Sequence, residues 1–206
     1  MATFLPARER RRLGMLLSAS SATLVVLVLV LVGIVAERSA HEPLVRVGHL
    51  APSFTLPSTS GGRVSLVQSR HRPVVLVFVP SVRCDLCREQ LRAVQAALPH
   101  LQGRGVLVFA ISTDTPASPR AAAAELGLGY PLLSEAPTVG RHPVGSAYGF
   151  YHYPEAHLGP VDANGIVVID GTGVVRAVRV QPGDLITDGE ILTTVRRALD
   201  RPGGDG

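Results

Sequence analysis

The spacing of apolar residues between residues 44 and 199 predicts an α/β domain. Residues 74–79 and 106–112 form short apolar runs rich in β-branched side chains, which is typical of buried strands. Between the two runs, apolar residues recur at helical spacing, at Leu91, Val94, Leu98 and Leu101. A strand, a helix and a second strand in this order require a parallel crossover, so we expect a sheet with helices packed against it.

Shorter elements are expected around these strands. Two strand-like pieces flank a Ser-Thr-Ser-Gly-Gly turn within residues 51–66, and we expect them to cover an edge of the sheet. Ser118 and Pro119 are typical of a helix cap and a first helical position, which predicts a helix opening there. The apolar runs at 165–170 and 174–180, separated by Gly-Thr-Gly, predict a hairpin.

The sequence also marks the ends of two helices. Pro99 and Gly103 are expected to end the helix that begins near residue 84. Thr187 and Glu190 have the spacing of a capping box, which predicts the start of a closing amphipathic helix. We expect residues 200–206 to form a disordered tail, because most of them are glycine, proline or charged residues.

A separate apolar segment precedes the domain. Residues 13–36 carry no charged side chain, and this length exceeds the roughly 20 residues that cross a bilayer. Residues 1–12 contain four arginines, and a basic flank stays on the cytoplasmic side. We therefore expect a cytoplasmic basic N-terminus at 1–12, a single transmembrane helix at 13–36, a tether at 37–43 and an extracytoplasmic domain at 44–199.

A cleaved signal peptide is the alternative for this segment. Ala36 or Ala40 could end a cleavage site, but the apolar stretch is long for a signal peptide. Ile34 or Arg38 would then occupy the third position before cleavage, where a small residue is usual. Under either interpretation the domain lies outside the cytoplasm, where disulfides persist.

The charge distribution excludes several function classes. Of the chain's net charge of +4, residues 1–12 contribute +3, so the rest of the chain is nearly neutral. A balanced domain implies no nucleic-acid partner. The 20 lysine and arginine residues are all arginine, which excludes mechanisms that use a lysine Schiff base or a phosphate-loop lysine. No Gly-rich nucleotide motif follows a strand, and no cofactor is expected.

The two cysteines, Cys84 and Cys87, follow the first apolar strand and lie at the start of the next helix. The thiolate is the reactive form of cysteine, and a helix N-terminus stabilises it. Arg83 and Arg88 favour the thiolate further, whereas Asp85 opposes it. Two intervening residues keep the sulfurs close enough to cycle between dithiol and disulfide, so redox chemistry is the first hypothesis.

Three other roles remain open for these residues. The pair could supply half of a zinc site, with distant histidines as the other ligands. It could be an inert structural disulfide, although so short a loop constrains the unfolded chain little. His142, His152 and His157 lie in a Gly- and Pro-rich loop and could join the thiols in a copper-handling site. Histidines in such loops are more often solvated, so we expect no bound metal.

The order of these segments resembles the peroxiredoxin form of the thioredoxin fold, the alkyl hydroperoxide reductase and thiol-specific antioxidant family. The resemblance covers about residues 44–199 and rests on APSFTLPSTSGGRVSL, PVVLVFVPSVRCDLCREQL, VLVFAISTDTP, YPLLSE and GIVVIDGTGVVRAV. It implies an α/β thioredoxin-like fold with a central mixed β-sheet flanked by helices.

The family's peroxidase motif is a proline, three residues, a threonine or serine, two residues and the attacking cysteine. Pro80 has this spacing relative to Cys87, and Cys84 then takes the place of the hydroxyl residue. If Cys84 is the attacking thiol, Ser81 takes the hydroxyl position and Val77 replaces the proline. The family also places an arginine just before the strand at 165–170, where this chain has PVDANG.

The resemblance implies a catalytic pair, Cys84 and Cys87, that forms a redox-active disulfide. Pro80, Ser81 and Arg83 are the residues expected to support it. The Cys-x-x-Cys pair looks like the dithiol branch of the superfamily, which includes membrane-tethered reductases of extracytoplasmic thiols.

Two catalytic functions fit this arrangement. The first, which we favour, is a membrane-anchored extracytoplasmic thiol-disulfide oxidoreductase, in which Cys84 attacks a protein disulfide and Cys87 resolves the mixed disulfide. The second is a thiol-dependent peroxidase, in which a hydroperoxide oxidises one cysteine to sulfenic acid and the other condenses with it. Both need an external thiol as electron donor. Non-enzymatic copper handling is the third hypothesis.

Overall fold

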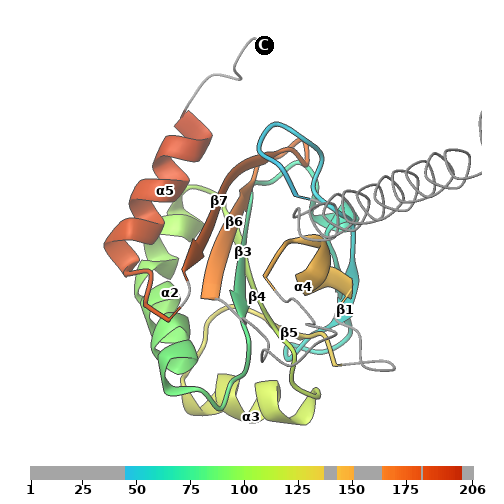
Figure 1. Ribbon diagram of the computed structural model, residues 1–206, viewed down its shortest axis with the longest axis vertical. Coiled ribbons are helices and arrows are strands. Elements are labelled where there is room, and N and C mark those ends of the chain that lie inside the picture. The colour runs from blue at the N-terminus through green and yellow to red at the C-terminus, as the bar shows by residue number, and fades with distance from the viewer. Residues whose placement is uncertain (1–44, 137–142, 151–163, 182, 201–206) are drawn as a thin grey trace, which may run out of the picture. The chain divides into compact units, whose positions relative to one another are not determined.

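A five-stranded mixed sheet forms the centre of the computed structural model, which describes residues 45–136, 143–150, 164–181 and 183–200 (Figure 1). In the order in which they lie side by side, its strands are β5 (Leu132–Ser134), β4 (Leu107–Ser112), β3 (Val74–Val79), β6 (Asn164–Ile169) and β7 (Val175–Gln181). β3, β4 and β5 run parallel to one another, whereas β6 is antiparallel to both of its neighbours.

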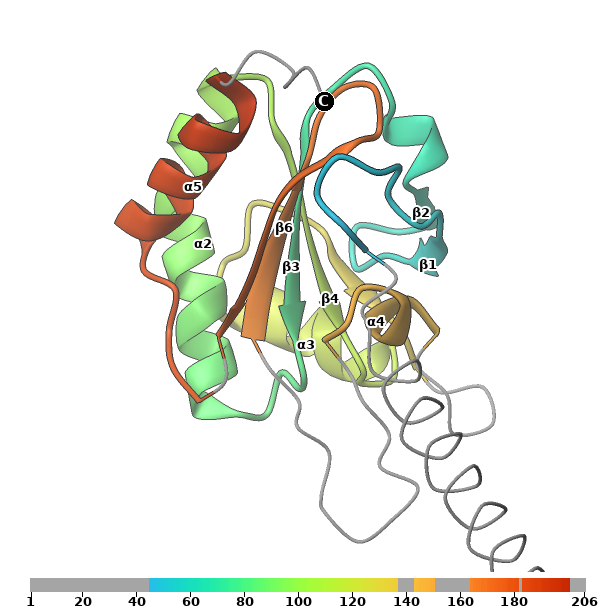
Figure 2. The ribbon, with the colours of Figure 1, turned by 45° about the horizontal axis from the view of Figure 1, so that its top comes forward.

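The predicted crossover connections are confirmed. Helix α2 (Asp85–Gly103) joins β3 to β4, and helix α3 (Ala117–Glu125) joins β4 to β5. Helices α2 and α5 (Asp188–Asp200) lie side by side on one face of the sheet, as Figures 1 and 2 both show. The short helix α4 (Pro143–Ala147) and strand β1 lie on the other face.

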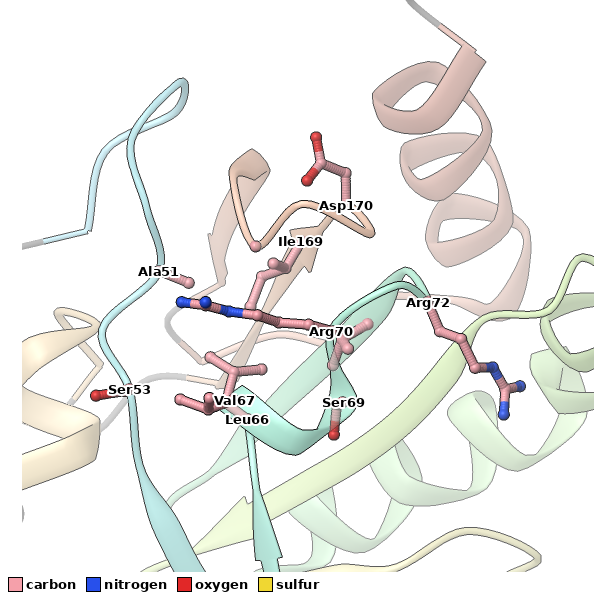
Figure 3. A pocket seen from close by; sticks show the side chains of 11 residues that line it. Ala51, Ser53, Leu66, Val67, Ser69, Arg70, Arg72, Ile169 and Asp170 are labelled. Atoms are coloured by element: carbon pink, nitrogen blue, oxygen red, sulfur yellow. The ribbon is translucent and has the colours of Figure 1, made fainter.

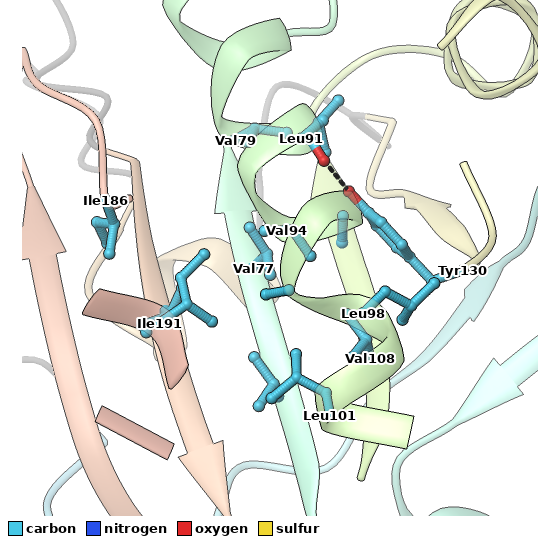
Figure 4. Packing of buried hydrophobic residues seen from close by; sticks show 14 of the residues in the cluster. Val77, Val79, Leu91, Val94, Leu98, Leu101, Val108, Tyr130, Ile186 and Ile191 are labelled. Atoms are coloured by element: carbon cyan, nitrogen blue, oxygen red, sulfur yellow. Dashed lines mark hydrogen bonds between the residues drawn. The ribbon is translucent and has the colours of Figure 1, made fainter. Parts of the chain in front are cut away.

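The side chains of β3 alternate between two hydrophobic layers. Val75, Val77 and Val79 pack in the layer that holds α2 and α5, whereas Leu76 and Phe78 pack in the opposite layer. Figure 4 shows the first layer, where side chains of α2 cover the sheet. Because both faces are covered, β3 reads in the sequence as an unbroken apolar run.

The turn at residues 58–62 covers the β5 edge of the sheet, as expected. It joins strand β1 (Thr55–Pro57) to the antiparallel strand β2 (Arg63–Ser65), and the short 3₁₀ helix η1 (Val67–Ser69) follows. The backbone N–H of Thr59 donates to the carbonyl of Leu132 in β5 at 3.0 Å. The hydroxyl of Thr59 accepts from the backbone N–H of Leu132 at 3.1 Å.

The predicted hairpin and closing helix are also confirmed. β6 and β7 pair across the turn that follows Asp170. The hydroxyl of Thr187 accepts the backbone N–H of Glu190 at 3.3 Å, and the Glu190 carboxylate accepts the Thr187 backbone N–H at 3.0 Å. Helix α5 extends through Asp200, one residue into the range expected to be the tail.

One predicted helix boundary is wrong and another is confirmed. Helix α3 begins at Ala117 with Pro116 as the residue before it, so Ser118 lies in the first turn and caps nothing. The Ser118 backbone N–H already donates to the carbonyl of Thr115, which closes a turn ahead of the expected start. Helix α2 ends at Gly103, as expected, and Pro99 lies inside the helix.

The predicted transmembrane helix at 13–36 lies outside the described residues. So do residues 1–12, the tether at 37–43, the tail at 201–206 and the histidines at 142, 152 and 157. Within the ranges that the structure describes, no helix combines the length and apolar character needed to span a bilayer. Membrane anchoring therefore stays a prediction.

Gly165 in β6 gives a sharp test of this packing. A Cβ at this position would lie 2.0 Å from Cε1 of Phe150 and 2.5 Å from the carbonyl oxygen of Arg179. The Phe150 ring is fully buried and stacks on Phe78 with centroids 4.3 Å apart, so it has no room to move. We expect Gly165→Ala to lower the free energy of unfolding by about 3 kcal/mol or more, measured by urea denaturation.

Gly189 supplies the matched control. It lies in the first turn of α5, and a Cβ there would meet no atom within 4 Å. Gly189→Ala should therefore be neutral or slightly stabilising, because alanine is the better helix former. Equal urea midpoints for the two variants would contradict the described packing of Phe150 on β6.

Candidate active site

Cys84 and Cys87 lie where β3 ends and α2 begins, as predicted. Cys84 is the residue that caps α2, and it has an extended backbone conformation. Its Sγ accepts a hydrogen bond from the backbone N–H of Cys87 at 3.2 Å. The sulfur therefore occupies the place that a capping hydroxyl or carboxylate oxygen usually takes. Both cysteines are free thiols in the structure.

The two thiols have different surroundings. Cys84 is exposed, whereas Cys87 is only 1% exposed and packs in the same hydrophobic layer as Val79, Val82 and Leu91. Burial, followed by the hydrogen bond to the Cys84 side chain, raises the pKa of Cys87 to about 12. Cys87 therefore stays protonated at neutral pH, and the exposed Cys84 is the thiol that an outside molecule can reach.

Asp114 holds the loop before the cysteines. Its carboxylate accepts hydrogen bonds from the backbone N–H of Val82 at 2.6 Å and from the hydroxyl of Ser81 at 3.1 Å. The neighbouring Thr113 donates its hydroxyl to the carbonyl of Pro80 at 2.5 Å. Two of the predicted supporting residues, Pro80 and Ser81, are thus tied to the carboxyl end of β4. Sequence reasoning missed Asp114, although it lies only two residues after a predicted strand.

The arginines near the pair are placed differently from one another. Arg83 is exposed, and its backbone N–H donates to the hydroxyl of Ser81 at 3.2 Å. Arg88 forms an ion pair with Glu125 of α3, and it also donates to the carbonyl of Val82 at 3.5 Å. The positive charge that Arg88 was expected to lend the thiolate is therefore partly offset by a carboxylate from another helix.

A shallow cavity of about 490 Å³ lies beside the pair, between the first turns of α2 and helix α3. Its lining carries both signs of charge, from Arg83, Asp85, Arg88 and Glu125. A second cavity, of about 20 Å³, is lined by Val67, Arg70 and Asp170 at the opposite end of the sheet (Figure 3). That volume holds about one water molecule. Of these two cavities, the larger is the one lined by the sequence neighbours of the cysteines.

Asn164 lies at the start of β6, within the segment where the family's arginine was sought. Its neighbour Gly165 pairs with Phe78, so Asn164 lies beside the end of β3 that leads to Pro80. Asn164 is 4% exposed, and its Oδ1 is the one buried side-chain polar atom of the described residues that lacks a hydrogen bond. An amide oxygen at this place can accept a hydrogen bond but brings no positive charge to a thiolate.

Metal ligands do not gather in the described part of the chain. Within it, no three histidine, cysteine, aspartate or glutamate side chains lie close enough together to hold a metal ion. The three histidines that suggested copper handling lie outside this part. The zinc and copper hypotheses therefore gain no support from the described residues.

Comparison with known proteins gives a consistent set of relatives. The chain matches the AhpC/TSA family over residues 47–178. It is 29% identical to alkyl hydroperoxide reductase E of Mycobacterium tuberculosis over 158 residues, which cover 76% of this chain and 99% of that protein. It is 35% identical to the chloroplastic peroxiredoxin Q of Gentiana triflora over 88 residues, which cover 43% of this chain and only 41% of that protein.

Solved structures share the fold. Peroxidoxin BcpB from Mycobacterium tuberculosis superposes with a TM-score of 0.64 at 22% identity, covering 77% of this chain and 99% of that chain. A putative protein disulfide isomerase from Bacteroides thetaiotaomicron gives 0.56 at 23% identity, covering 74% of this chain and 87% of that chain. These likenesses confirm the expected α/β thioredoxin-like fold with a mixed sheet.

The relatives also bear on activity. Peroxiredoxin homologues indicate a thiol-dependent oxidoreductase or peroxidase, in agreement with the enzyme class expected from the cysteine pair. The family match spans more than half of the chain and includes β3, the cysteine pair, β6 and the first residues of β7. The chain therefore belongs to the AhpC/TSA family.

Proposed function

We propose that this member of the AhpC/TSA family is a thiol-disulfide oxidoreductase that reduces protein disulfides. One observation carries the proposal: an exposed thiol, Cys84, caps a helix directly beside a buried and protonated thiol, Cys87. The exposed sulfur can attack a large partner, and the buried one is protected from that partner until the first step is complete.

The reaction has two exchange steps. The thiolate of Cys84 attacks one sulfur of the target disulfide, so that a mixed disulfide forms and the other target sulfur leaves as a thiolate. Cys87 then loses its proton and attacks the Cys84 sulfur, which releases the second target sulfur. The target gains two electrons and the protein becomes a Cys84–Cys87 disulfide. An external dithiol or two monothiols restore the reduced pair.

The charge distribution around the pair supports a protein disulfide as substrate. Breaking a peroxide bond develops negative charge on oxygen, which a nearby cation or an array of donors must stabilise. Arg88 is engaged with Glu125, and the uncharged Asn164 lies beside the end of β3. The cavity beside the pair carries both signs of charge, which suits a polypeptide better than a small hydroperoxide.

A thiol-dependent peroxidase is the second candidate, and the names of the relatives favour it. Several are peroxiredoxins or alkyl hydroperoxide reductases. In this reaction the Cys84 thiolate attacks the peroxide, the O–O bond breaks, an alcohol leaves, and Cys84 becomes a sulfenic acid. Cys87 then condenses with it, forming the disulfide and releasing water. The roles of the two cysteines are the same.

Location is part of the proposal. The charge-free segment at 13–36 and the basic residues before it support an anchor that holds the domain outside the cytoplasm. A maleimide reagent that does not cross membranes should label Cys84 in intact cells under reducing conditions. Labelling that requires cell lysis would contradict this location.

The substrate class is tested with the full chain in detergent or nanodiscs. We expect the reduced protein to be oxidised by insulin, a protein with disulfides, at least about tenfold faster than by cumene hydroperoxide at equal concentration. The reverse order of rates would reject the disulfide proposal and favour the peroxidase. The Cys84→Ser variant is the control for background exchange in both reactions.

A further inference from the structure

The carboxylate of Asp114 accepts three hydrogen bonds, two of them from the loop that precedes the cysteines. Its Oδ2 accepts the backbone N–H of Val82 at 2.6 Å and the hydroxyl of Ser112 at 2.7 Å, and its Oδ1 accepts the hydroxyl of Ser81 at 3.1 Å. Ser81 and Val82 belong to the loop between β3 and α2, whereas Asp114 follows β4. The carboxylate thus ties two segments that lie more than 30 residues apart in the chain.

Asp114 is itself held by the sheet. Its backbone N–H donates to the hydroxyl of Ser112 in β4 at 3.1 Å, and its carbonyl accepts the hydroxyl of Ser134 in β5 at 2.5 Å. Ser112 and Ser134 are both buried. A carboxylate anchored on two strands can impose a conformation on the loop, because the strands are more rigid than the loop.

The loop in turn contacts the backbone of Cys84 and the thiol of Cys87. The carbonyl of Ser81 accepts the backbone N–H of Cys84 at 3.4 Å, and the Ser81 hydroxyl accepts the backbone N–H of Arg83 at 3.2 Å. Burial raises the pKa of Cys87, and a hydrogen bond from the Ser81 backbone opposes that rise. A displacement of Ser81 would therefore disturb the surroundings of Cys84 and Cys87 together.

We propose that Asp114 is a positioning residue for the dithiol. Its carboxylate fixes the loop at 80–83 so that the Cys84 sulfur stays at the cap of α2 and the Cys87 sulfur stays hydrogen-bonded beneath it. The proposal rests on the proposed function for the role of Cys84 as the attacking thiol. Nothing in the proposed function itself assigns a task to a residue at the end of β4.

Positioning and charge make opposite predictions for Asp114. A carboxylate near a thiol disfavours the thiolate, so an effect through charge alone predicts a more reactive thiol when Asp114 is neutralised. Positioning predicts a less reactive Cys84, because a loosened loop would lose the hydrogen bonds that join Ser81 to the Cys84 backbone and to the Cys87 thiol. The sign of the change therefore separates the two explanations.

The Asp114→Asn variant of the full chain tests the proposal. We expect the rate of Cys84 alkylation by iodoacetamide at pH 7 to fall about tenfold, since the Cys84 sulfur no longer keeps its exposed position at the cap of α2. We also expect the dithiol–disulfide equilibrium with glutathione to shift about tenfold toward the disulfide, which corresponds to a potential about 30 mV more negative. An unchanged or faster alkylation rate would overturn the proposal.

Three variants make the result specific. Asp85→Asn removes a negative charge between the same cysteines without touching the loop bonds of Asp114, so it should not slow alkylation. Ser134→Ala removes one of the bonds that anchor Asp114 to the sheet, so it should slow alkylation, but less than Asp114→Asn does. Ser81→Ala removes one donor, and it should slow alkylation in the same direction even if Asp114→Asn fails to fold.

The outcome is independent of the substrate. Alkylation and glutathione exchange report on the two thiols without a target protein. If the protein fails to reduce insulin but Asp114→Asn still slows alkylation, the proposed function is rejected and the positioning role is supported. If insulin is reduced and Cys84 of the Asp114→Asn variant is alkylated at the native rate, only the positioning role is rejected.

Discussion

Replacing Cys84 by serine lowers the rate of disulfide reduction by about a thousandfold or more, whereas replacing Cys87 by serine leaves the first attack intact. A serine hydroxyl is not ionised at neutral pH and lacks the nucleophilicity of a thiolate, so Cys84→Ser has no attacking group. Cys87→Ser keeps the exposed thiol but has no resolving group. Its mixed disulfide with insulin should therefore accumulate as a covalent product, and a reductant should cleave that product.

The measurement is a non-reducing gel with mass spectrometry of the trapped product. Cys87→Ser should trap an adduct on Cys84, whereas Cys84→Ser should trap little, because the remaining Cys87 is buried. An adduct on Cys87 in the Cys84→Ser variant, formed at a rate close to that of the native chain, would reverse the assigned roles. Thermal unfolding of both variants supplies the control for folding.

The second expected result is a steep dependence of the resolving step on pH. The pKa of Cys87 is raised to about 12, chiefly because burial disfavours its thiolate. At any pH well below that value, the ionised fraction rises about tenfold for each unit of pH. Burial also acts on Cys87 in the mixed disulfide, so release of the second target sulfur should accelerate with each unit of pH between pH 7 and pH 10.

Stopped-flow release of the target thiol from a preformed mixed disulfide measures this step alone. Cys87→Ser should show none of the pH-dependent release, which separates it from hydrolysis of the adduct. A release rate that levels off just above pH 9 would contradict a buried and protonated Cys87, because the thiol would then ionise close to its ordinary pKa of 9.0.

The position of the cysteine pair could be predicted because the signals are local. An apolar run, Pro80 and two cysteines predict a strand, a turn and a helix start within about fifteen residues, and the structure has all three in place. The capping box of Thr187 and Glu190 is equally local, and it too is confirmed. The helix start at Ser118 failed because Pro116 already begins the turn.

The difference in burial between Cys84 and Cys87 could not be predicted, because it arises from contacts between distant segments. Cys87 packs in a hydrophobic layer that also includes side chains of β6 and α5, which are far from it in the sequence. Asp114 reaches Ser81 and Val82 across more than 30 residues of sequence. Glu125 likewise approaches Arg88 only because α3 folds back beside the start of α2.

The most direct test of the account is the relative alkylation of the two thiols in the reduced full chain. Iodoacetamide at pH 7, followed by digestion and mass spectrometry, measures the modification of Cys84 and of Cys87 in the same sample. The exposed Cys84 should react at least about a hundredfold faster than the buried Cys87. Equal rates, or faster modification of Cys87, would contradict the assignment of Cys84 as the attacking thiol.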